Sequence, residues 1–534
     1  MFKKILVANR GVAAVRIART LKLMGISSVA LRSDAERDSK YFETFDEVYD
    51  LVGDSVAQTY LDVDQIIGIA KEAKAEAIHP GYGFLSENAD FAAKVAQAGL
   101  AFLGPAPDVI NAFGLKHEAR AIAEEQGVPI LKGTSVLPNL AAAIAAADQV
   151  TFPLLLKSTA GGGGIGMQRC DSAEDLESAY ESVTALAASN FTSPGVFLEK
   201  CITKARHVEV QLFGDGLGNI IILGDRDCSL QRRNQKLVEE CPAPNLPDDI
   251  RLSMHDRARA LAASVNYSSA GTVEFLYDAE ANEYYFLEVN TRLQVEHGVT
   301  ELVYKVDIVE WMIRLAFGDL PSCAELEAAL KPFGAAVQVR LYAEDPYENY
   351  KPTPGELDAV FPDKGRIDSW VAERCLVSHW FDPLLANIMG YGETRERAIH
   401  QLLDTLGNSR IHGTTTNIAL LQQAVDCQPF RDGNVDTKLL SGLAYQASEL
   451  EILRPGLEMM VQSHPGRQGY WDVGVPPSGP MDDLSFQLGN RMLGNAATAA
   501  GLEMVLSGAK IRFRGATRCV LSGAKMHATL DDRQ

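Results

Sequence analysis

A glycine-rich run follows a short apolar segment in the first third of the chain. The apolar residues 152–156 are typical of a strand, and Lys157 leads from them into a loop that contains Gly161, Gly162, Gly163, Gly164 and Gly166. Such a loop can fold exposed backbone amides around phosphate oxygens. It is not a P-loop, because Lys157 precedes the glycines and no Gly-Lys-Ser/Thr sequence follows them. The run predicts a phosphate-binding loop, with a flexible hairpin tip as the alternative.

Polar side chains recur at every second position between residues 288 and 296. They are Glu288, Asn290, Arg292, Gln294 and Glu296. Alternate side chains of an extended strand share one face. The pattern therefore predicts a single wall of carboxylate, amide and guanidinium groups, although a solvated edge strand would alternate in the same way.

A third carboxylate, Glu274, lies in an otherwise apolar run that is typical of a buried strand. A buried charge needs a partner. Glu274, Glu288 and Asn290 offer hard oxygen ligands, which suit Mg²⁺ or Mn²⁺ that takes its other ligands from ATP phosphates. No cluster of His and Cys favours zinc.

The elements that must position these residues begin with an α/β unit. Residues 4–8, 12–23 and 28–31 predict a strand, a helix and a second strand, and the intervening Asn9-Arg10-Gly11 lacks the three-glycine dinucleotide fingerprint. NAD binding is therefore not predicted. A second unit runs over residues 114–332, and a third over 333–445, with a strand at 336–343 and a helix at 394–406.

The composition of the sequence changes near residue 446. Residues 446–454 are predicted to be a linker, and Gly, Pro and short apolar runs at 510–513 and 518–521 predict an all-β domain after it. Only about 80 residues of that domain are present, which is short for a closed β core. We therefore expect the chain to be part of a longer protein.

Composition narrows the classes of function. The 534 residues carry a net charge of −20, which disfavours nucleic acid and anionic membranes as partners. No apolar run is long enough to span a bilayer, and the start lacks the pattern of a signal peptide, so a cytoplasmic protein is expected. The eight cysteines are scattered, without zinc or redox spacing, and are expected to be reduced thiols.

At this point the sequence resembles the biotin carboxylases of the ATP-grasp superfamily over residues 1 to about 445. Besides the two runs above, the resemblance rests on residues 8–11, 79–88, 102–105, 114–116, 206–211 and 226–233, all in register. It implies an α/β and α+β multidomain fold, with an N-terminal domain at 1–113, an ATP-grasp domain at 114–332 and a C-terminal domain at 333–445. A mobile lid is expected near residues 131–203.

The resemblance also implies roles for individual residues. For ATP, it implies that Lys116 and Lys157 contact the phosphates, that the glycine loop is a lid, that Glu199, Lys200 and Ile202 hold the adenine, and that His207 and Gln231 lie near the ribose. Met167 and Asn234 are also implied to bind ATP. The metal ligands would be Glu274, Glu288 and Asn290. Bicarbonate would be held by Lys236, Arg292, Gln294 and the Val295 amide, and biotin by Tyr82 and Arg340.

The implied reaction passes through carboxyphosphate. Glu296 would act as general base on bicarbonate, and Arg340 would stabilise the biotin enolate by offering charge to its ureido oxygen. Closure of the glycine lid would exclude water from this intermediate. ATP, Mg²⁺ (or Mn²⁺) and biotin are therefore the expected cofactors.

Four positions depart from the common biotin carboxylase pattern: Val12, Ile165, Asn234 and Asn387. Ile165 and Asn234 are features associated with urea carboxylases, whereas Asn387, in the biotin-facing region, has no explanation in the sequence. Residues 466–470, 474–482, 488–495 and 502–508 resemble the second subunit of allophanate hydrolase. A domain of this kind follows the biotin carboxylase in urea carboxylase, so residues 455–534 are predicted to begin a carboxyltransferase domain.

The expected partners follow from the same resemblance. No biotin attachment motif is present, since Lys525 lacks the preceding Met, so the carrier domain and the rest of the carboxyltransferase are expected elsewhere. Bicarbonate would be the first substrate, and urea or guanidine the final acceptor. Homodimerisation is common among such enzymes, although the sequence does not show it. The alternatives are a component of an acyl-CoA carboxylase and an ATP-binding regulatory protein.

Overall fold

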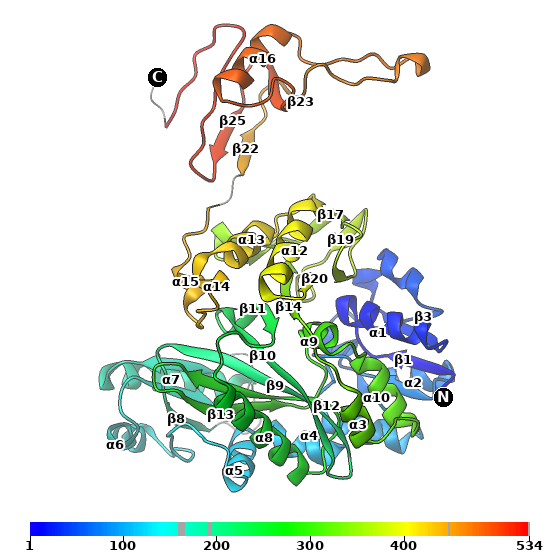
Figure 1. Ribbon diagram of the computed structural model, residues 1–534, viewed down its shortest axis with the longest axis vertical. Helices are drawn as coiled ribbons and strands as arrows, with labels where there is room; N and C mark the ends of the chain where they lie inside the picture. Colours follow the sequence, from blue (N-terminus) through cyan, green and yellow to red (C-terminus); the bar gives the residue numbers. More distant parts are fainter. Residues whose placement is uncertain (159–165, 191–194, 447–448, 532–534) are drawn as a thin grey trace. The chain divides into compact units, whose positions relative to one another are not determined.

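The computed structural model describes residues 1–534 except 159–165, 191–194, 447–448 and 532–534. The chain forms two compact units, Met1–Leu443 and Ala444–Gln534, and each is described by itself. The first unit contains both α/β and α+β parts, as expected (Figure 1). Among the described residues, no helix is both long and apolar enough to cross a bilayer.

A parallel five-stranded sheet opens the first unit, with strand order β3-β2-β1-β4-β5. Its strands are β1 Lys4–Val7, β2 Ser27–Arg32, β3 Glu47–Asp50, β4 Ala77–His79 and β5 Ala101–Phe102. The accompanying helices are α1 Gly11–Leu23, α2 Val63–Glu72, α3 Ala89–Gln97, α4 Pro107–Gly114 and α5 Lys116–Glu125. The predicted strand, helix and strand over residues 4–31 are confirmed, and Val12 is buried in α1.

An eight-stranded antiparallel sheet forms the centre of the first unit, in the order β13-β12-β9-β10-β11-β14-β20-β18. Its strands are β9 Ala205–Asp215, β10 Ile220–Arg232, β11 Gln235–Cys241, β12 Ser268–Asp278, β13 Glu283–Asn290, β14 Ala335–Tyr342, β18 Arg366–Ser369 and β20 Leu384–Gly392. The sheet crosses the boundary predicted at residues 332 and 333, because β11 pairs with β14.

Strand β9 shows why this sheet can carry a site. Val208, Val210 and Leu212 pack into a large apolar core, and the alternate residues His207, Glu209 and Gln211 are buried polar groups. Since successive side chains point to opposite faces, one face of β9 is apolar and the other is functional. Helix α8 Asp248–Ser264 packs on β9 and β10, and α12 Arg395–Asn408 packs on β14 and β20.

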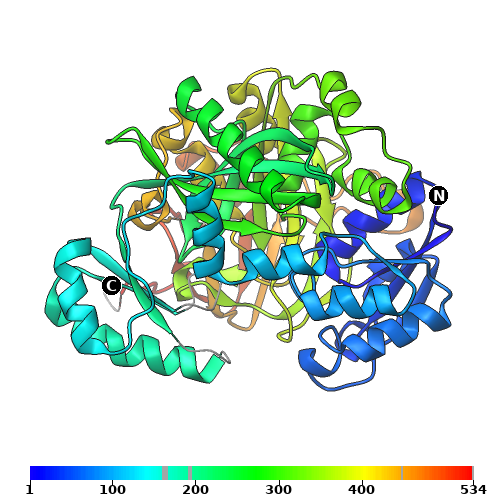
Figure 2. The same cartoon turned by 90° about the horizontal axis from the view of Figure 1, so that it is seen from below.

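A separate three-stranded sheet, β7-β6-β8, is expected to be the lid. It comprises β6 Leu154–Ser158, β7 Met167–Cys170 and β8 Val196–Lys200, with α6 Leu140–Val150 and α7 Ala173–Asn190. In Figure 2 this cyan segment projects on the side opposite the blue N-terminal sheet. Of the predicted glycine loop, Gly161, Gly162, Gly163 and Gly164 lie outside the described residues, whereas Gly166 is described.

The first unit contains further helices and strands. The helices are α9 His297–Tyr304, α10 Ile308–Phe317, α11 Cys323–Ala329, α13 Ile418–Asp426, α14 Gln428–Arg431 and α15 Leu439–Gly442. The strands are β15 Glu344–Asp345, β16 Lys351–Pro352, β17 Gly355–Val360, β19 Cys375–Val377 and β21 Arg410–His412. The predicted strand at 336–343 and helix at 394–406 correspond to β14 and α12.

The second unit corrects three expectations. Residues 450–454 are not linker but strand β22 Leu450–Arg454, which pairs with β25 Lys510–Phe513 and so satisfies its backbone groups. Residues 518–521 form no strand. The unit is not all-β, because α16 Asp483–Met492 accompanies the pair of β23 Glu458–Gln462 with β24 Gly501–Val505.

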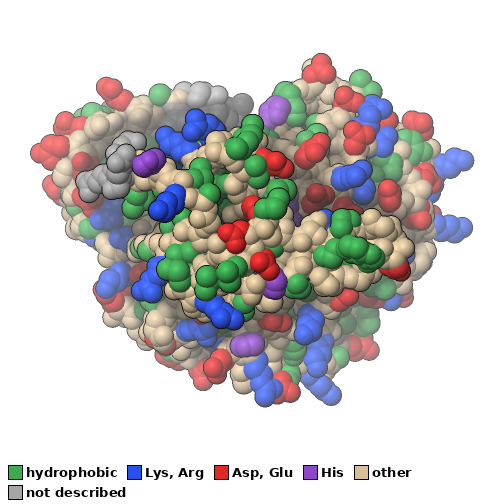
Figure 3. All heavy atoms as spheres, turned by 90° about the horizontal axis from the view of Figure 1, so that it is seen from above, with side chains coloured by type: hydrophobic (Ala, Val, Ile, Leu, Met, Phe, Trp, Pro, Cys, Tyr) green, Lys and Arg blue, Asp and Glu red, His purple; other side chains and the backbone are tan. Residues whose placement is uncertain are grey.

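Surface charge is mixed in sign. Figure 3 shows Lys and Arg side chains interspersed with Asp and Glu over the visible face. On that face, basic groups do not merge into a broad area of the kind that would attract a phosphate backbone.

Candidate active site

A cleft of about 1110 Å³ in the first unit brings together most of the predicted site residues. Its lining includes residues of strands β6, β7 and β8, of the central strands β9 to β14, and of the segment after β13. The predicted residues that line it are Lys116, Lys157, Met167, Lys200, Ile202, His207, Gln231, Asn234, Lys236, Glu274, Glu288, Asn290, Arg292, Gln294, Val295 and Arg340. Glu296 is fully buried beside two of them, Lys236 and Arg340.

Lys236, on β11, is held by three carboxylates. Its Nζ donates to Glu209 Oε2 at 2.7 Å, Glu274 Oε1 at 2.8 Å and Glu296 Oε1 at 2.7 Å. Burial alone would lower the pKa of Lys236, but these carboxylates raise it well above its usual value. Lys236 is therefore a permanent cation, as an anion-binding site requires.

The predicted general base is ionised in this network. Arg340 Nη2 donates to Glu296 Oε2 at 3.0 Å, while Lys236 donates to the other oxygen. Burial would raise the pKa of Glu296, but Lys236, Arg340 and Arg226 together lower it. A carboxylate in this state can accept a proton from a group placed against it.

The predicted metal ligands face one another across two strands. Glu274 and Glu288 are register partners of β12 and β13, and Asn290 Nδ2 donates to Glu274 Oε1 at 2.9 Å. Like charges directly opposite in a sheet repel. Burial and the Glu274 charge raise the pKa of Glu288, so a cation between the two carboxylates would be stabilising. The oxygen donors fit Mg²⁺ or Mn²⁺.

The segment after Asn290 corrects the prediction of one extended wall. Strand β13 ends at Asn290, and residues 291–296 turn into α9 instead of continuing the alternation. Glu87 Oε1 accepts from the Thr291 amide and Glu87 Oε2 from Arg292 Nε at 2.8 Å, which fixes the turn. The turn brings Val295, expected on the opposite face, to the cleft with Arg292 and Gln294.

His207 and Gln231, which are predicted to lie near the ribose, are in contact in the cleft. Gln231 Nε2 lies 2.7 Å from His207 Nδ1, and His207 Nε2 lies 2.8 Å from Glu274 Oε2. Burial alone would lower the pKa of His207, but Glu274 raises it. This pair therefore connects the predicted ribose region to the predicted metal ligands.

Glu199 is placed differently from its predicted neighbours. Its carboxylate is buried and forms ion pairs with Lys157 and Arg120, and it is not among the residues that line the cleft. Two of the residues predicted near the adenine, Lys200 and Ile202, do line the cleft. A nucleotide phosphate near Lys157 would compete with Glu199 for its ammonium group.

Two departures from the family pattern have local explanations. Arg233 and Asn234 both have positive φ, 49° and 67°, in the turn that joins β10 to β11. Asparagine tolerates this backbone region well. Asn387 is the register partner of Arg340 on β20, and its Nδ2 lies 3.5 Å from the Val295 carbonyl oxygen. It therefore adjoins both Arg340, which is predicted to contact biotin, and the turn that is predicted to hold bicarbonate.

Tyr82 reaches the same region from the N-terminal sheet. Its hydroxyl is buried without a hydrogen-bond partner among the described residues, and burial raises its pKa. Tyr82 is not among the residues that line the cleft, so its contact with biotin stays a prediction.

Sequence reasoning missed several residues that hold the predicted ones in place: the exposed Glu87 and the buried Glu209, Arg226, Cys228 and Glu239. Arg226 is 0% exposed and donates to Glu209, Gln211, Thr272 and Thr300. The available signal was the polar alternation of the β9 segment, which marks Glu209 as a buried charge needing cations.

Arg226→Met should destabilise the first unit by about 3–5 kcal/mol, because it leaves Glu209 with one cation fewer in a buried site. The measurement is the free energy of unfolding by denaturant. The control is Arg397→Met, which removes an exposed ion pair between the first turn of α12 and Glu393 just before the helix, and which should cost about 0.5 kcal/mol. Equal losses in the two variants would contradict this prediction.

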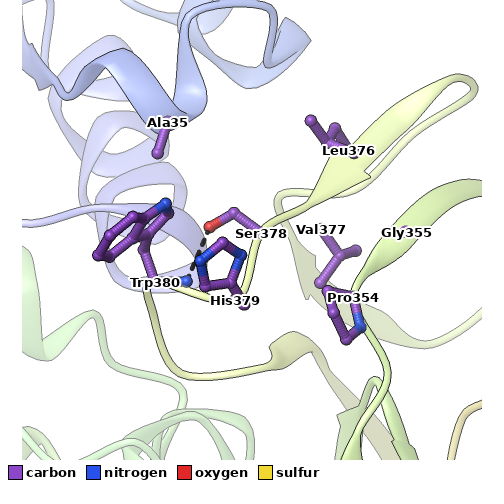
Figure 4. Close-up of a pocket in the computed structure, with 8 residues that line it drawn as sticks. All are labelled: Ala35, Pro354, Gly355, Leu376, Val377, Ser378, His379 and Trp380. Atoms are coloured by element: carbon purple, nitrogen blue, oxygen red, sulfur yellow. Dashed lines mark hydrogen bonds between the residues drawn. The ribbon is translucent and has the colours of Figure 1, made fainter.

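A second groove, of about 400 Å³, has none of this chemistry. It lies between Ala35, the β17–β19 region and Trp380, and its lining includes Pro354, Leu376 and Val377 (Figure 4). His379 is its one titratable lining residue in the described part of the chain. Phosphate or bicarbonate would find no lysine or arginine there.

Comparison with known proteins is consistent with this geometry. Family models match residues 1–110 (biotin carboxylase, N-terminal domain), 116–322 (carbamoyl-phosphate synthase L chain, ATP binding domain), 338–442 (biotin carboxylase C-terminal domain) and 473–534 (carboxyltransferase domain, subdomain A and B). The chain is 44% identical to biotin carboxylase 2 of Bacillus subtilis, and the match covers 82% of this chain and 99% of that protein.

A solved structure gives the same result. The biotin carboxylase domain of Hydrogenobacter thermophilus 2-oxoglutarate carboxylase, a dimer with MgADP, ADP and bicarbonate, is 37% identical, with a TM-score of 0.79 over 83% of this chain and 97% of that one. The chain belongs to the biotin carboxylase family of ATP-dependent ligases.

A relative that matches both units of the chain is a urea amidolyase. The chain is 47% identical over its whole length to the urea amidolyase of Saccharomyces cerevisiae, and it spans 29% of that protein.

Proposed function

We propose that this chain catalyses the ATP- and bicarbonate-dependent carboxylation of biotin, as the first half-reaction of a urea or guanidine carboxylase. The observation that carries the proposal is the buried group of Lys236, Glu296 and Arg340 beside a cleft that also contains the opposed carboxylates Glu274 and Glu288. A nucleotide-binding regulator needs no such anion site with its own base.

The residues suggest a division of work along the cleft. Lys116 and Lys157 would neutralise ATP phosphates, and Lys200 and Ile202 would contact the adenine. Glu274, Glu288 and Asn290 would hold Mg²⁺ or Mn²⁺, which would neutralise phosphate charge during phosphoryl transfer. Lys236, Arg292, Gln294 and the Val295 amide would hold bicarbonate as a planar anion.

Two groups would accept protons during the reaction, the Glu296 carboxylate and the phosphate released from carboxyphosphate. Glu296 would remove the proton of bicarbonate while a bicarbonate oxygen attacks the terminal phosphorus of ATP, and ADP would leave. Carboxyphosphate would then break into CO₂ and phosphate, the phosphate would take the proton of biotin N1′, and N1′ would attack the CO₂ carbon to form carboxybiotin. Arg340 would offer positive charge to the ureido oxygen during that step.

The acceptor and the partners are part of the same proposal. The second unit matches a carboxyltransferase model and the whole chain matches a urea amidolyase, which favours urea or guanidine over an acyl-CoA. A biotin carrier domain and the remainder of a carboxyltransferase would complete the reaction, and a homodimer is the expected assembly. All eight cysteines are free thiols, which is consistent with a reducing compartment such as the cytoplasm.

The first experiment measures ADP release by the purified chain with Mg·ATP and bicarbonate, with and without free biotin. We expect biotin to stimulate release, and urea or guanidine to have no effect without the transferase partners. Tight ATP binding without biotin stimulation would overturn the proposal and leave nucleotide binding alone.

A second experiment separates the acceptors. With a biotinylated carrier and a carboxyltransferase added, ADP release should depend on urea or guanidine. Dependence on an acyl-CoA would instead identify a component of an acyl-CoA carboxylase.

A further inference from the structure

Glu239 is a fully buried carboxylate of β11 with no role in the reaction described above. Its Oε1 accepts from Arg340 Nε at 2.5 Å, and its Oε2 accepts from Gln338 Nε2 at 3.1 Å. Burying a carboxylate is costly unless it is paired. The contact with Arg340 is therefore a strong, specific restraint on that side chain.

The register of the sheet explains why these groups meet. Glu239 on β11 is the register partner of Gln338 on β14, and Arg340 follows two residues later on the same face of β14. Diagonal neighbours of this kind lie within reach of long side chains. The restraint is therefore built into two central strands and not into a loop.

Arg340 is held at two different atoms. Nε is bound by Glu239, and Nη2 is bound by Glu296. A guanidinium group is planar, so two anchors at separate nitrogens fix its rotation as well as its position. Among the ion pairs of the described residues, Glu239 and Glu296 are the two carboxylates that Arg340 meets.

We propose that Glu239 is a positioning residue: by binding Arg340 at Nε, it restricts Arg340 to one contact with Glu296 and keeps its charge turned toward the cleft. Without Glu239, the guanidinium can turn and bind Glu296 with two nitrogens, since a bidentate pair is the stronger arrangement. Arg340 would then bind both oxygens of the Glu296 carboxylate, and its charge would no longer face the ureido oxygen of biotin. This inference rests on the proposed function, because the role of Arg340 is defined there.

The test compares Glu239→Gln with Glu240→Gln in ADP release by the whole chain. Glu240 is a matched control, since it is the next residue of β11, equally buried, and paired with an arginine, Arg395, at 2.6 and 3.1 Å. Arg395 is not among the residues that line the cleft.

We expect Glu239→Gln to lower the biotin-dependent kcat by at least about tenfold, because small misplacements of a positioned charge cost this much. The KM values for ATP and bicarbonate should change by less than about threefold, because Lys236 and Arg292 are untouched. Glu240→Gln should match the wild-type chain in all three quantities. A purely structural role for Glu239 would lower every activity together with stability.

Glu239→Asp is the second variant, and it keeps the charge while shortening the reach. Its biotin-dependent kcat should lie between those of the wild-type chain and Glu239→Gln, and it is the variant to measure if the glutamine form does not fold. The inference is overturned if both variants keep the wild-type biotin-dependent kcat, or if they lose no more than Glu240→Gln does. Failure of the wild-type chain to respond to biotin would instead overturn the proposed function.

Discussion

Glu296→Gln should abolish biotin-dependent ADP release while ATP still binds. The loss should be about 10²–10⁴-fold in kcat, which is the usual contribution of a positioned general base. The glutamine oxygen can still accept from Lys236, and Lys236 keeps Glu209 and Glu274 as partners, so the network should stay folded. The measurement is steady-state ADP release at saturating ATP, bicarbonate and biotin.

A neighbouring substitution serves as the control for that variant. Cys228 Sγ lies 3.9 Å from Glu296 Oε1 and is equally buried, so Cys228→Ala changes the surroundings of the base but not the base itself. We expect it to retain most of the rate. If Glu296→Gln turned over as fast as Cys228→Ala, Glu296 would not be the base.

Glu288→Gln should raise the Mg²⁺ concentration needed for half-maximal activity by at least about tenfold, since one of two anionic ligands is lost. The metal-free protein should be no less stable, because the substitution also removes the repulsion between Glu288 and Glu274 across β12 and β13. Mg²⁺ titrations of ADP release and thermal unfolding in a chelator measure the two effects.

Glu283→Gln is the matched control on the same strand. Glu283 is an exposed residue of β13 whose carboxylate accepts from Tyr285, outside the cleft. Its substitution should leave the Mg²⁺ requirement unchanged. An unchanged requirement in Glu288→Gln as well would exclude Glu288 as a metal ligand.

Sequence patterns predicted those parts of the molecule in which periodicity and burial agree. Residues 4–8 and 28–31 are apolar runs that suit strands buried on both faces of a parallel sheet, residues 12–23 repeat at helical spacing, and the structure has all three elements at those positions. Residues 450–454 were predicted wrongly because their pairing partner, β25, begins 56 residues after Arg454, and no local pattern shows that contact.

The sequence predicted which residue types form the site, but it did not predict which side chains contact one another. Glu274 and Glu288 are both polar positions in strand patterns, but only the register of β12 with β13 places them opposite one another. Likewise, the three partners of Lys236 come from β9, β12 and the turn before α9, which are far apart in the chain. The turn at 291–296 was missed because its alternation is the same as that of a strand.

The crowding of carboxylates around Lys236 has a consequence for anion discrimination. An anion entering this site must share Lys236 with Glu209, Glu274 and Glu296, all of which already satisfy its three N–H groups. Bicarbonate carries a hydroxyl hydrogen that it can direct at Glu296, so its approach replaces repulsion with a hydrogen bond. Nitrate has the same planar shape and charge but no hydrogen, so the neighbouring carboxylates would repel it without a compensating hydrogen bond. Under the proposed function, the site would thus select bicarbonate by the hydrogen that this anion can donate as well as by its charge.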